Sequence, residues 1–310
     1  MNKFIIKALS LIVLFIVVVM ILIFAMPKDN NSYFSEYRCK IHLLESVAQP
    51  RVIIIGGSGV AFGTDSKRIK DSLNINVVNF GLHAGLGIRY PLEDCLEYIK
   101  KGDIVAIQME YENYFSGGNG GPEAFLPFMI STGWRKTHNL NIYQWENIFL
   151  GIKDVCKANL TRLAYFLITK SFDKKPSGMT FEYAKSGFNE YGDEVSHLKY
   201  PSKHIEIPQK AGGKSINESF IMWLSQIIDK YEHAGAKVYM MPPPCSMSQF
   251  KASYDKNISK TLDKIHHPFI VEPASNAFDD SCSFDTGYHM NKVGVCLNTN
   301  NIIKALRNKM

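Results

Sequence analysis

The chain lacks the sequence signatures of several common kinds of site. Its six cysteines are widely spaced and form no C-x-x-C pair, so neither a zinc ribbon nor a thioredoxin-like redox site is indicated. The net charge of +6 is spread over scattered lysines without a dense basic stripe, which argues against a nucleic-acid surface. No internal repeat is present. We therefore expect no metal ion, no cofactor and no nucleic-acid partner.

The N-terminus carries a long apolar run. Lys3 and Lys7 precede residues 8–26, a stretch of 19 residues without charge. As a helix this stretch would be roughly 28 Å long, about the thickness of a bilayer core. We expect a cytoplasmic tail at 1–7, an uncleaved transmembrane signal anchor at 8–26, and the remaining chain outside the cytoplasm. A cleaved signal peptide is the alternative, but the run ends in Ile-Phe-Ala-Met-Pro rather than at a small-residue cleavage site.

The six cysteines leave their redox state open. An oxidising compartment permits disulfides, and six cysteines allow 15 complete pairings among which the sequence does not choose. Buried free thiols are equally compatible with the pattern. The residues are Cys39, Cys95, Cys156, Cys245, Cys282 and Cys296.

Strands and helices alternate after a polar segment, 27–50, that we expect to be a stalk. The folded domain is predicted to span 51–310. Expected strands are 51–55, 76–80, 103–108, 237–241 and 269–272, and expected helices are 65–73, 91–101, 215–234, 246–264 and 292–307. Short β-branched runs alternating with amphipathic helices predict a three-layer α/β/α sandwich with a parallel sheet.

The alternation is interrupted at about 115–214. This stretch contains clustered glycines, a helical pattern at 143–168 and a polar segment beyond it. So long an interruption inside a compact domain is usually functional or disordered. We expect an insertion that forms a lid or a cap over the substrate.

A glycine-rich turn, Gly56-Gly57-Ser58-Gly59, directly follows the first strand. A dinucleotide-binding turn would need a small residue where Phe62 stands and an acid near Asn79, and a phosphate-binding loop would need a following Gly-Lys-Ser/Thr. The remaining alternatives are a nucleophilic Ser58 presented at a helix start, or glycines that only let strand and helix approach closely.

A second polar segment near the C-terminus contains Asp285 and His289, just before the last predicted helix. A serine hydroxyl is a poor nucleophile until a histidine accepts its proton, and a carboxylate holds that histidine in the correct tautomer. Together with Ser58, these residues predict a nucleophile, a general base and an orienting acid.

Further polar groups follow the second and third strands. Glycines from Gly81 onward bring backbone N–H groups to the end of the sheet, where an oxyanion needs donors, and the Asn113 amide is another candidate donor. His83 is either a substrate ligand or incidental. Glu110 and Glu112 suggest paired glycosidase carboxylates, but residues two apart in an extended chain point to opposite faces, which disfavours that chemistry.

These segments resemble the four conserved blocks of the SGNH (GDSL-like) hydrolase superfamily. Within it, the chain is most similar to the membrane-anchored bacterial branch of DltD- and AlgJ-type acyltransferase proteins. Asn113 is the nearest match in the third block, with Glu110 and Glu112 as alternatives. The matching residues are Gly57, Ser58 and Gly63 in the first block, Gly81 in the second, and Asp285 and His289 in the fourth.

The resemblance implies acyl-ester chemistry at the cell surface. Ser58 would carry the acyl group, with Asp285 and His289 completing the triad and Ser58, Gly81 and Asn113 forming the oxyanion hole. The implied substrates are an acyl donor, acetyl in type, and a surface polysaccharide. A polytopic membrane acyltransferase is the implied partner. Two alternatives remain: an esterase or deacetylase of the same fold that uses water, and a non-catalytic polysaccharide-binding component.

Overall fold

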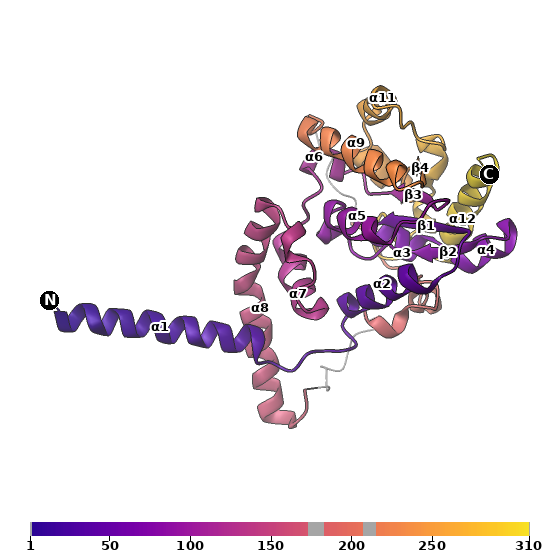
Figure 1. Ribbon diagram of the computed structural model, residues 1–310. Coiled ribbons are helices and arrows are strands. Elements are labelled where there is room, and N and C mark those ends of the chain that lie inside the picture. Colours follow the sequence, from indigo (N-terminus) through magenta and orange to yellow (C-terminus); the bar gives the residue numbers. More distant parts are fainter. Residues whose placement is uncertain (1, 173–182, 207–214, 310) are drawn as a thin grey trace.

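A parallel sheet flanked by helices forms the centre of the protein (Figure 1). The computed structural model describes residues 2–172, 183–206 and 215–309. Within these residues the main sheet has the order β2-β1-β3-β4, and every neighbouring pair is parallel. Its strands are β1 (Arg51–Gly56), β2 (Asn76–Asn79), β3 (Ile104–Gln108) and β4 (Lys237–Met240). All four strands therefore end at one edge of the sheet, where ligand sites of such folds lie.

Four of the five expected strands are confirmed. The exception is 269–272, which makes only one bridge, between Phe269 and Met240, and one hydrogen bond from Ile270 N–H to the Met240 carbonyl. Pro273 then begins a turn, and a proline has no N–H with which to extend a ladder. A separate pair of two-residue strands, β5 (Cys245–Ser246) and β6 (Ala277–Phe278), was not expected.

Alternate residues of β1 enter two different apolar clusters. Val52 and Ile54 pack in one cluster and Ile53 and Ile55 in the other, as expected for a strand buried on both faces. Helices α4 and α12 contribute to the first cluster, and α2, α5 and α9 contribute to the second. The helices of this body are α2 (Glu36–Ser46), α3 (Ser58–Gly63), α4 (Ser66–Leu73), α5 (Arg89–Cys95), α9 (Glu218–His233), α10 (Met247–Ser253), α11 (Lys256–Lys264) and α12 (Lys292–Arg307).

The expected stalk at 27–50 is wrong for its second half. Tyr37, Ile41 and Leu44 lie on one face of α2 and are buried in the core. Their spacing of four and three residues is that of an apolar helix face, so this segment belongs to the folded body. Arg51, which also donates to the Leu44 carbonyl of α2, forms a buried bidentate ion pair with Asp103, with both N–O distances 3.0 Å.

Two expected helices differ in their bounds. The helix expected at 91–101 begins at Arg89 and ends at Cys95, followed by a short 3₁₀ turn. The helix expected at 246–264 is divided into α10 and α11, because Asp255 is extended and caps α11 by accepting from the Asn257 N–H. The expected helices at 65–73, 215–234 and 292–307 are confirmed with small shifts at their ends.

The interruption at 115–214 contains two kinds of structure. The first is helical, with α6 (Asn113–Ser116), α7 (Pro122–Thr132) and α8 (Ile142–Thr169), which confirms the helix expected at 143–168. The second, 183–206, packs beside β2, where Tyr191 accepts from the Asn79 N–H. Asp193, also from this segment, accepts from Ser66 and Asn79. The parts of the interruption at 173–182 and 207–214 lie outside the described residues.

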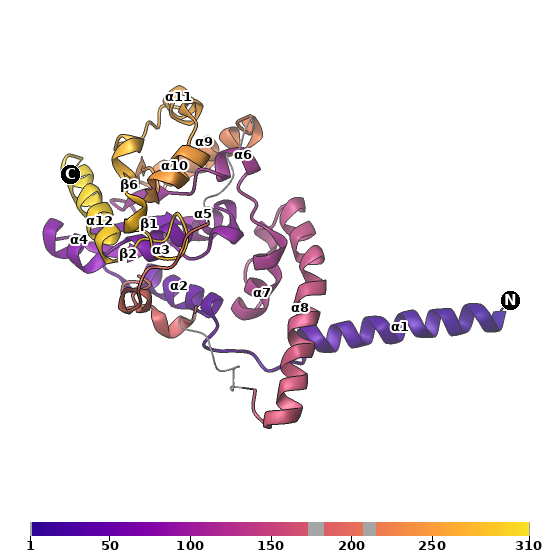
Figure 2. The same cartoon turned by 180° about the vertical axis from the view of Figure 1, so that it is seen from behind.

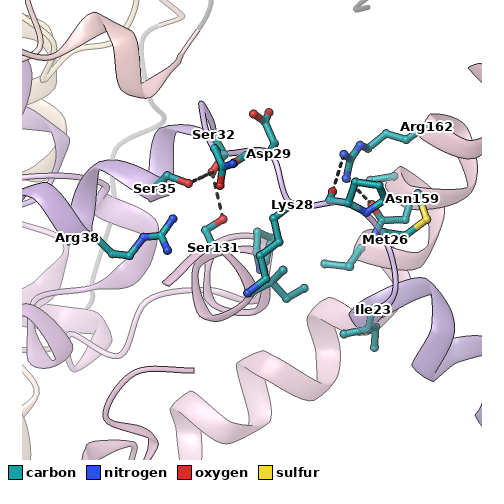
Figure 3. A pocket seen from close by; sticks show the side chains of 16 residues that line it. Ile23, Met26, Lys28, Asp29, Ser32, Ser35, Arg38, Ser131, Asn159 and Arg162 are labelled. Carbon is teal, nitrogen blue, oxygen red and sulfur yellow. Dashed lines mark hydrogen bonds between the residues drawn. The ribbon is translucent and has the colours of Figure 1, made fainter. Parts of the chain in front are cut away.

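An apolar N-terminal helix, α1 (Asn2–Phe24), projects from this body (Figures 1 and 2). Within residues 3–24 an 18-residue window reaches a mean hydropathy of 3.1, and the helix is long and apolar enough to cross a membrane. The helix also includes most of the expected tail at 1–7. Arg162 of α8 donates to the Pro27 carbonyl just beyond it (Figure 3). All six cysteines lie in the described part of the chain as free thiols.

Candidate active site

Ser58 is the first residue of α3, directly after β1. Glycine is needed in the turn before it. A Cβ on Gly56 would lie 2.2 Å from the Gln108 carbonyl oxygen, and one on Gly57 would lie 2.3 Å from Glu110 Oε1. The first N–H groups of a helix have no acceptor within that helix. The turn thus presents the Ser58 hydroxyl beside a backbone donor at the edge where the strands end.

His289 and Asp285 form the expected acid–base pair. The ring Nδ1 lies 2.8 Å from Asp285 Oδ1, and both side chains are largely buried. Burial raises the pKa of Asp285, but the hydrogen bond and charge of His289 outweigh it and hold that pKa below its ordinary value. The imidazole stacks on Phe62 with ring centroids 4.1 Å apart. Because Nδ1–H donates to Asp285, Nε2 carries the lone pair that a general base needs.

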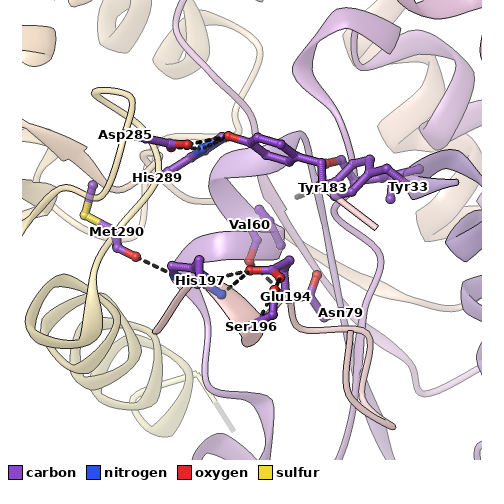
Figure 4. A network of polar contacts seen from close by, with 11 residues as sticks. Tyr33, Val60, Asn79, Tyr183, Glu194, Ser196, His197, Asp285, His289 and Met290 are labelled. Atoms are coloured by element: carbon purple, nitrogen blue, oxygen red, sulfur yellow. Dashed lines mark hydrogen bonds and ion pairs between the residues drawn. The ribbon is translucent and has the colours of Figure 1, made fainter. Parts of the chain in front are cut away.

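Tyr183 is a third member of this group, and no sequence pattern predicted it. Its hydroxyl donates to Asp285 Oδ2 at 2.6 Å and lies 3.4 Å from His289 Nδ1 (Figure 4). Burial, then the neighbouring carboxylate, raises the pKa of Tyr183, so the phenol remains a neutral donor. Each carboxylate oxygen of Asp285 therefore has its own partner, which fixes the plane of the carboxylate.

Ser58 and His289 line the same cavity, of about 600 Å³. The two ends of the domain thus meet at one site, although Ser58 Oγ makes no hydrogen bond to the ring or to any other described residue. Catalytic contacts in empty sites are often open and tighten when substrate binds. The other lining residues are Tyr33, Phe34, His83, Ala84, Tyr183, Thr286 and Tyr288.

Gly81 is not among the residues that line this cavity, and its N–H group is not available as an oxyanion donor. Its N–H donates to Asn79 Oδ1 at 2.9 Å, inside the buried core. A Cβ on Gly81 would lie 2.5 Å from Val60 Cβ and 2.8 Å from the Ala61 nitrogen. The glycine is therefore needed for the close approach of this loop to α3, and its N–H is already satisfied.

Asn113 also points elsewhere. Its amide donates to the Glu110 carbonyl at 3.1 Å, at the start of α6, and it is not among the residues that line the cavity. Of the two alternatives for this position, the Glu110 side chain reaches the nucleophile turn, where Oε1 accepts from the Gly59 N–H at 3.2 Å. Burial raises the pKa of Glu110 to about 7, although backbone N–H donors oppose the shift.

Glu112 bonds to a different set of partners from Glu110, and the backbone at these two residues is a turn rather than an extended strand. Its carboxylate accepts from the Tyr288 hydroxyl at 2.8 Å, from Ser253 Oγ at 2.5 Å and from Gln249 Nε2 at 3.0 Å. These bonds hold Tyr288, a cavity-lining residue, against α10. Glu112 therefore shapes the cavity wall through Tyr288.

His83 lies in the cavity wall and is held in one tautomer. Its Nδ1 accepts a hydrogen bond from the Gly85 N–H at 2.9 Å, so the proton of the neutral ring is on Nε2. Burial, together with the nearby His289, lowers the pKa of His83 to about 4. The ring is therefore a neutral N–H donor at physiological pH.

A second buried histidine supports the backbone beside His289. His197 donates from Nε2 to the Met290 carbonyl at 2.8 Å, and its Nδ1 contacts the Glu194 carboxylate (Figure 4). The Glu194 N–H in turn donates to the Ala61 carbonyl of α3 at 2.9 Å. The segment 183–206 therefore connects the histidine loop to the nucleophile helix. A Glu-x-x-His spacing was the only sequence signal of this connection.

Comparison with protein-family models and with curated proteins finds no match to this chain. Across residues 2–172, 183–206 and 215–309 no group of three or more histidine, cysteine, aspartate or glutamate side chains is placed to hold a metal ion. The candidate active site is therefore defined by its own geometry, with Ser58 and an Asp285-held His289 facing one cavity.

Proposed function

We propose that this protein is a serine acyl-ester enzyme that transfers an acyl group, acetyl in type, to a cell-surface or exported polysaccharide. One observation carries the proposal: His289, oriented by Asp285, faces the cavity into which Ser58 is presented. The strands that end at this edge support the finer assignment of the fold as an SGNH-like three-layer α/β/α sandwich.

The residues fit a two-step transfer. Ser58 Oγ attacks the carbonyl carbon of the acyl donor while His289 Nε2 accepts its proton. The donor's alcohol leaves with that proton, and an acyl ester remains on Ser58. A sugar hydroxyl then gives its proton to Nε2 and attacks the same carbonyl; the bond to Ser58 Oγ breaks, and Nε2 returns the proton to that oxygen, which leaves the acylated sugar and the free serine. Asp285 stabilises the imidazolium that exists during each step.

The oxyanion hole differs from the one expected by resemblance. Because the Gly81 N–H and the Asn113 amide are bonded elsewhere, we assign the donors to the Ser58 N–H and to His83 Nε2–H. A neutral imidazole donates a hydrogen bond without carrying a positive charge, so it does not repel the imidazolium that His289 becomes during the reaction. Replacing His83 by alanine should lower kcat by about 100-fold, and glutamine, which keeps an N–H donor, should restore part of the loss.

The apolar helix α1 supports a single-pass bacterial membrane location, with Lys3 and Lys7 on the cytoplasmic side and the catalytic body outside the cytoplasm. An acyl group made in the cytoplasm must then cross the membrane to reach Ser58. A polytopic membrane acyltransferase that delivers it is therefore part of the proposal, by analogy with the resembling proteins.

A fluorophosphonate probe tests the nucleophile. The serine oxygen bonds to phosphorus and fluoride leaves, so labelling requires an activated hydroxyl. We expect labelling of the full-length protein in detergent to be lost in Ser58→Ala and kept in Ser72→Ala, which changes an exposed serine of α4. If the folded wild type is not labelled, the protein is the non-catalytic binding component instead.

The acceptor needs a second measurement. With p-nitrophenyl acetate as donor and an oligosaccharide present, transfer gives an acetylated sugar detectable by mass spectrometry, whereas an esterase gives only free acetate. Both activities should disappear in His289→Ala. Release of acetate without acetylated sugar, over a panel of acceptors, would assign hydrolysis rather than transfer to this site.

A further inference from the structure

The long helix α8 runs across the end of α1 rather than beside it (Figures 1 and 2). Two side chains of α8 fix this crossing. Asn159 Nδ2 donates to the Leu22 carbonyl at 2.7 Å, and Arg162 donates to the Pro27 carbonyl at 2.9 Å. The last carbonyl groups of a helix receive no hydrogen bond from within the helix, so donors from outside must bond to them. The orientation of α8 relative to α1 is therefore specified by polar contacts.

One face of α8 is buried, and the opposite, exposed face carries apolar side chains together with a few charged ones. Ile148 and Val155 are buried on the side that faces α7, where Gly151 allows an approach to the Pro122 carbonyl. The exposed charged residues Glu146, Lys153 and Lys157 lie within an arc of about 100° on the helix surface, and six exposed apolar side chains share that arc. They are Ile142, Phe149, Leu150, Leu160, Leu167 and Ile168, with exposed fractions from 53% to 80%. Six large exposed apolar side chains on one face of a surface helix mark an interaction site.

This exposed face lies on the side from which α1 arrives. Phe149, Leu150 and Leu160 of α8 form an apolar cleft of about 880 Å³ in the corner with Phe15 and Leu22 of α1. In both views α7 and the sheet lie on the other side of α8. A bilayer crossed by α1 would therefore meet the apolar face of α8 directly.

Basic side chains lie within this face. Lys153 and Lys157 project from the exposed side of α8 and line the same corner cleft, and the acidic side chains of Glu146 and Asp154 are also exposed on this helix. On the other side of the junction, Lys28 and Arg38 line a smaller pocket of about 220 Å³ at the end of α1 (Figure 3). Long lysine and arginine side chains can reach from an apolar face to the phospholipid headgroups, so apolar residues interspersed with them suit a helix in the headgroup region of a leaflet.

We propose that α8 is a membrane-surface helix whose apolar face lies in the phospholipid leaflet that α1 leaves, with lipid acyl chains filling the corner cleft. This inference depends on the proposed membrane anchoring by α1. The catalytic body is then held at two places, by α1 through the bilayer and by α8 along its surface. Since α7 packs between α8 and the Tyr33–Ser35 turn, the cavity has a fixed height and orientation above the lipid.

Quenching by lipid nitroxides tests this placement in the full-length protein reconstituted in phospholipid nanodiscs. In a background with Cys39→Ser, Cys156→Ser and Cys296→Ser, the environment-sensitive dye NBD is attached at Leu160→Cys. A second variant carries the dye at Leu11→Cys in α1. The control keeps native Cys296, which is exposed on α12, and carries the dye there.

With a nitroxide near the top of the lipid chains, we expect at least about a twofold loss of fluorescence at position 160, and almost none at Cys296. Quenching at position 11 but not at 160 would overturn the inference while leaving the anchor intact. No quenching at position 11 would remove the anchor and the inference together, and fluorophosphonate labelling of Ser58 would still report separately on the proposed chemistry. Equal quenching at 160 and 296 would also overturn the proposed orientation.

Discussion

The substitution Glu110→Gln offers a direct test of the electrostatics around the nucleophile turn. The Glu110 carboxyl is buried, and its nearest donor is the Gly59 N–H at 3.2 Å. Burial raises its pKa from 4.5 to about 7, a larger effect than the opposing backbone donors. Glutamine has the same shape and keeps an oxygen for the Gly59 N–H, but it cannot ionise. The variant therefore removes a single titration with little change in packing.

The expected magnitude follows from linkage. Between pH 4.5 and pH 7 the folded state keeps the proton on Glu110 while the unfolded state has lost it, so stability falls as the pH rises through this window. One pKa unit corresponds to 1.36 kcal/mol, which gives a total loss on the order of 3 kcal/mol, of which about 2.5 kcal/mol falls between pH 5 and pH 8. Glu110→Gln should therefore gain about this much stability over wild type from pH 5 to pH 8.

Urea unfolding of the two proteins in the same detergent, at pH 5 and at pH 8, measures this difference directly. Other titrating groups affect both proteins equally and cancel. Glu232→Gln, on the exposed surface of α9, is a control that should show no pH-dependent difference. If the difference between Glu110→Gln and wild type is the same at both pH values, Glu110 does not titrate in this window and our account of the turn is wrong.

Three further substitutions test separate parts of the structure. Gly81→Ala should destabilise the protein by about 3 kcal/mol, because a Cβ at this position has no space. At Gly59 the nearest atom to an added Cβ would be 3.6 Å away, so Gly59→Ala should change stability by less than about 1 kcal/mol. Equal urea midpoints for the two variants would contradict this account. Arg51→Met leaves Asp103 buried without its partner and should cost about 3–5 kcal/mol, so an unchanged midpoint would show that the pair is solvated. Asp285→Asn should lower kcat on the order of 10³-fold or more with an unchanged circular dichroism spectrum, and retained turnover would remove Asp285 from the mechanism.

The parallel sheet was predictable because its signal is local. The β-branched runs at Arg51–Gly56 and Ile104–Gln108 are short and continuous, and they are followed by glycine or polar residues that end a strand. The helix at Glu36–Ser46 carried an equally local signal in the spacing of Tyr37, Ile41 and Leu44, but its polar surroundings favoured a stalk. Its burial depends on contacts with Phe80, Tyr90 and Phe128, which are distant in the sequence.

At the candidate active site, the sequence pattern predicted some residues and not others. The nucleophile turn and the Asp285–His289 pair were predictable, because each needs only a short segment with a fixed order of residue types. The oxyanion donors were not. Whether the Gly81 N–H is available depends on one neighbouring amide, Asn79, and a pattern of residue types does not show which acceptor a donor finds. The role of Tyr183 likewise depends on how a separate segment folds back onto Asp285.

The chain between the proposed membrane anchor and the cavity is short, and this constrains the proposed reaction. Eight residues, 25–32, lie between Phe24, the last residue of α1, and Tyr33, which lines the cavity. Fully extended, they reach at most roughly 30 Å. The Ser32 hydroxyl is also hydrogen-bonded to the Ser131 hydroxyl of α7. This bond holds the segment against α7, which packs on α8. A substrate held far from the bilayer would therefore have to come to the enzyme. An acyl donor presented at the membrane surface would lie within the range that the tether allows, which is the arrangement that delivery by a membrane-embedded partner requires.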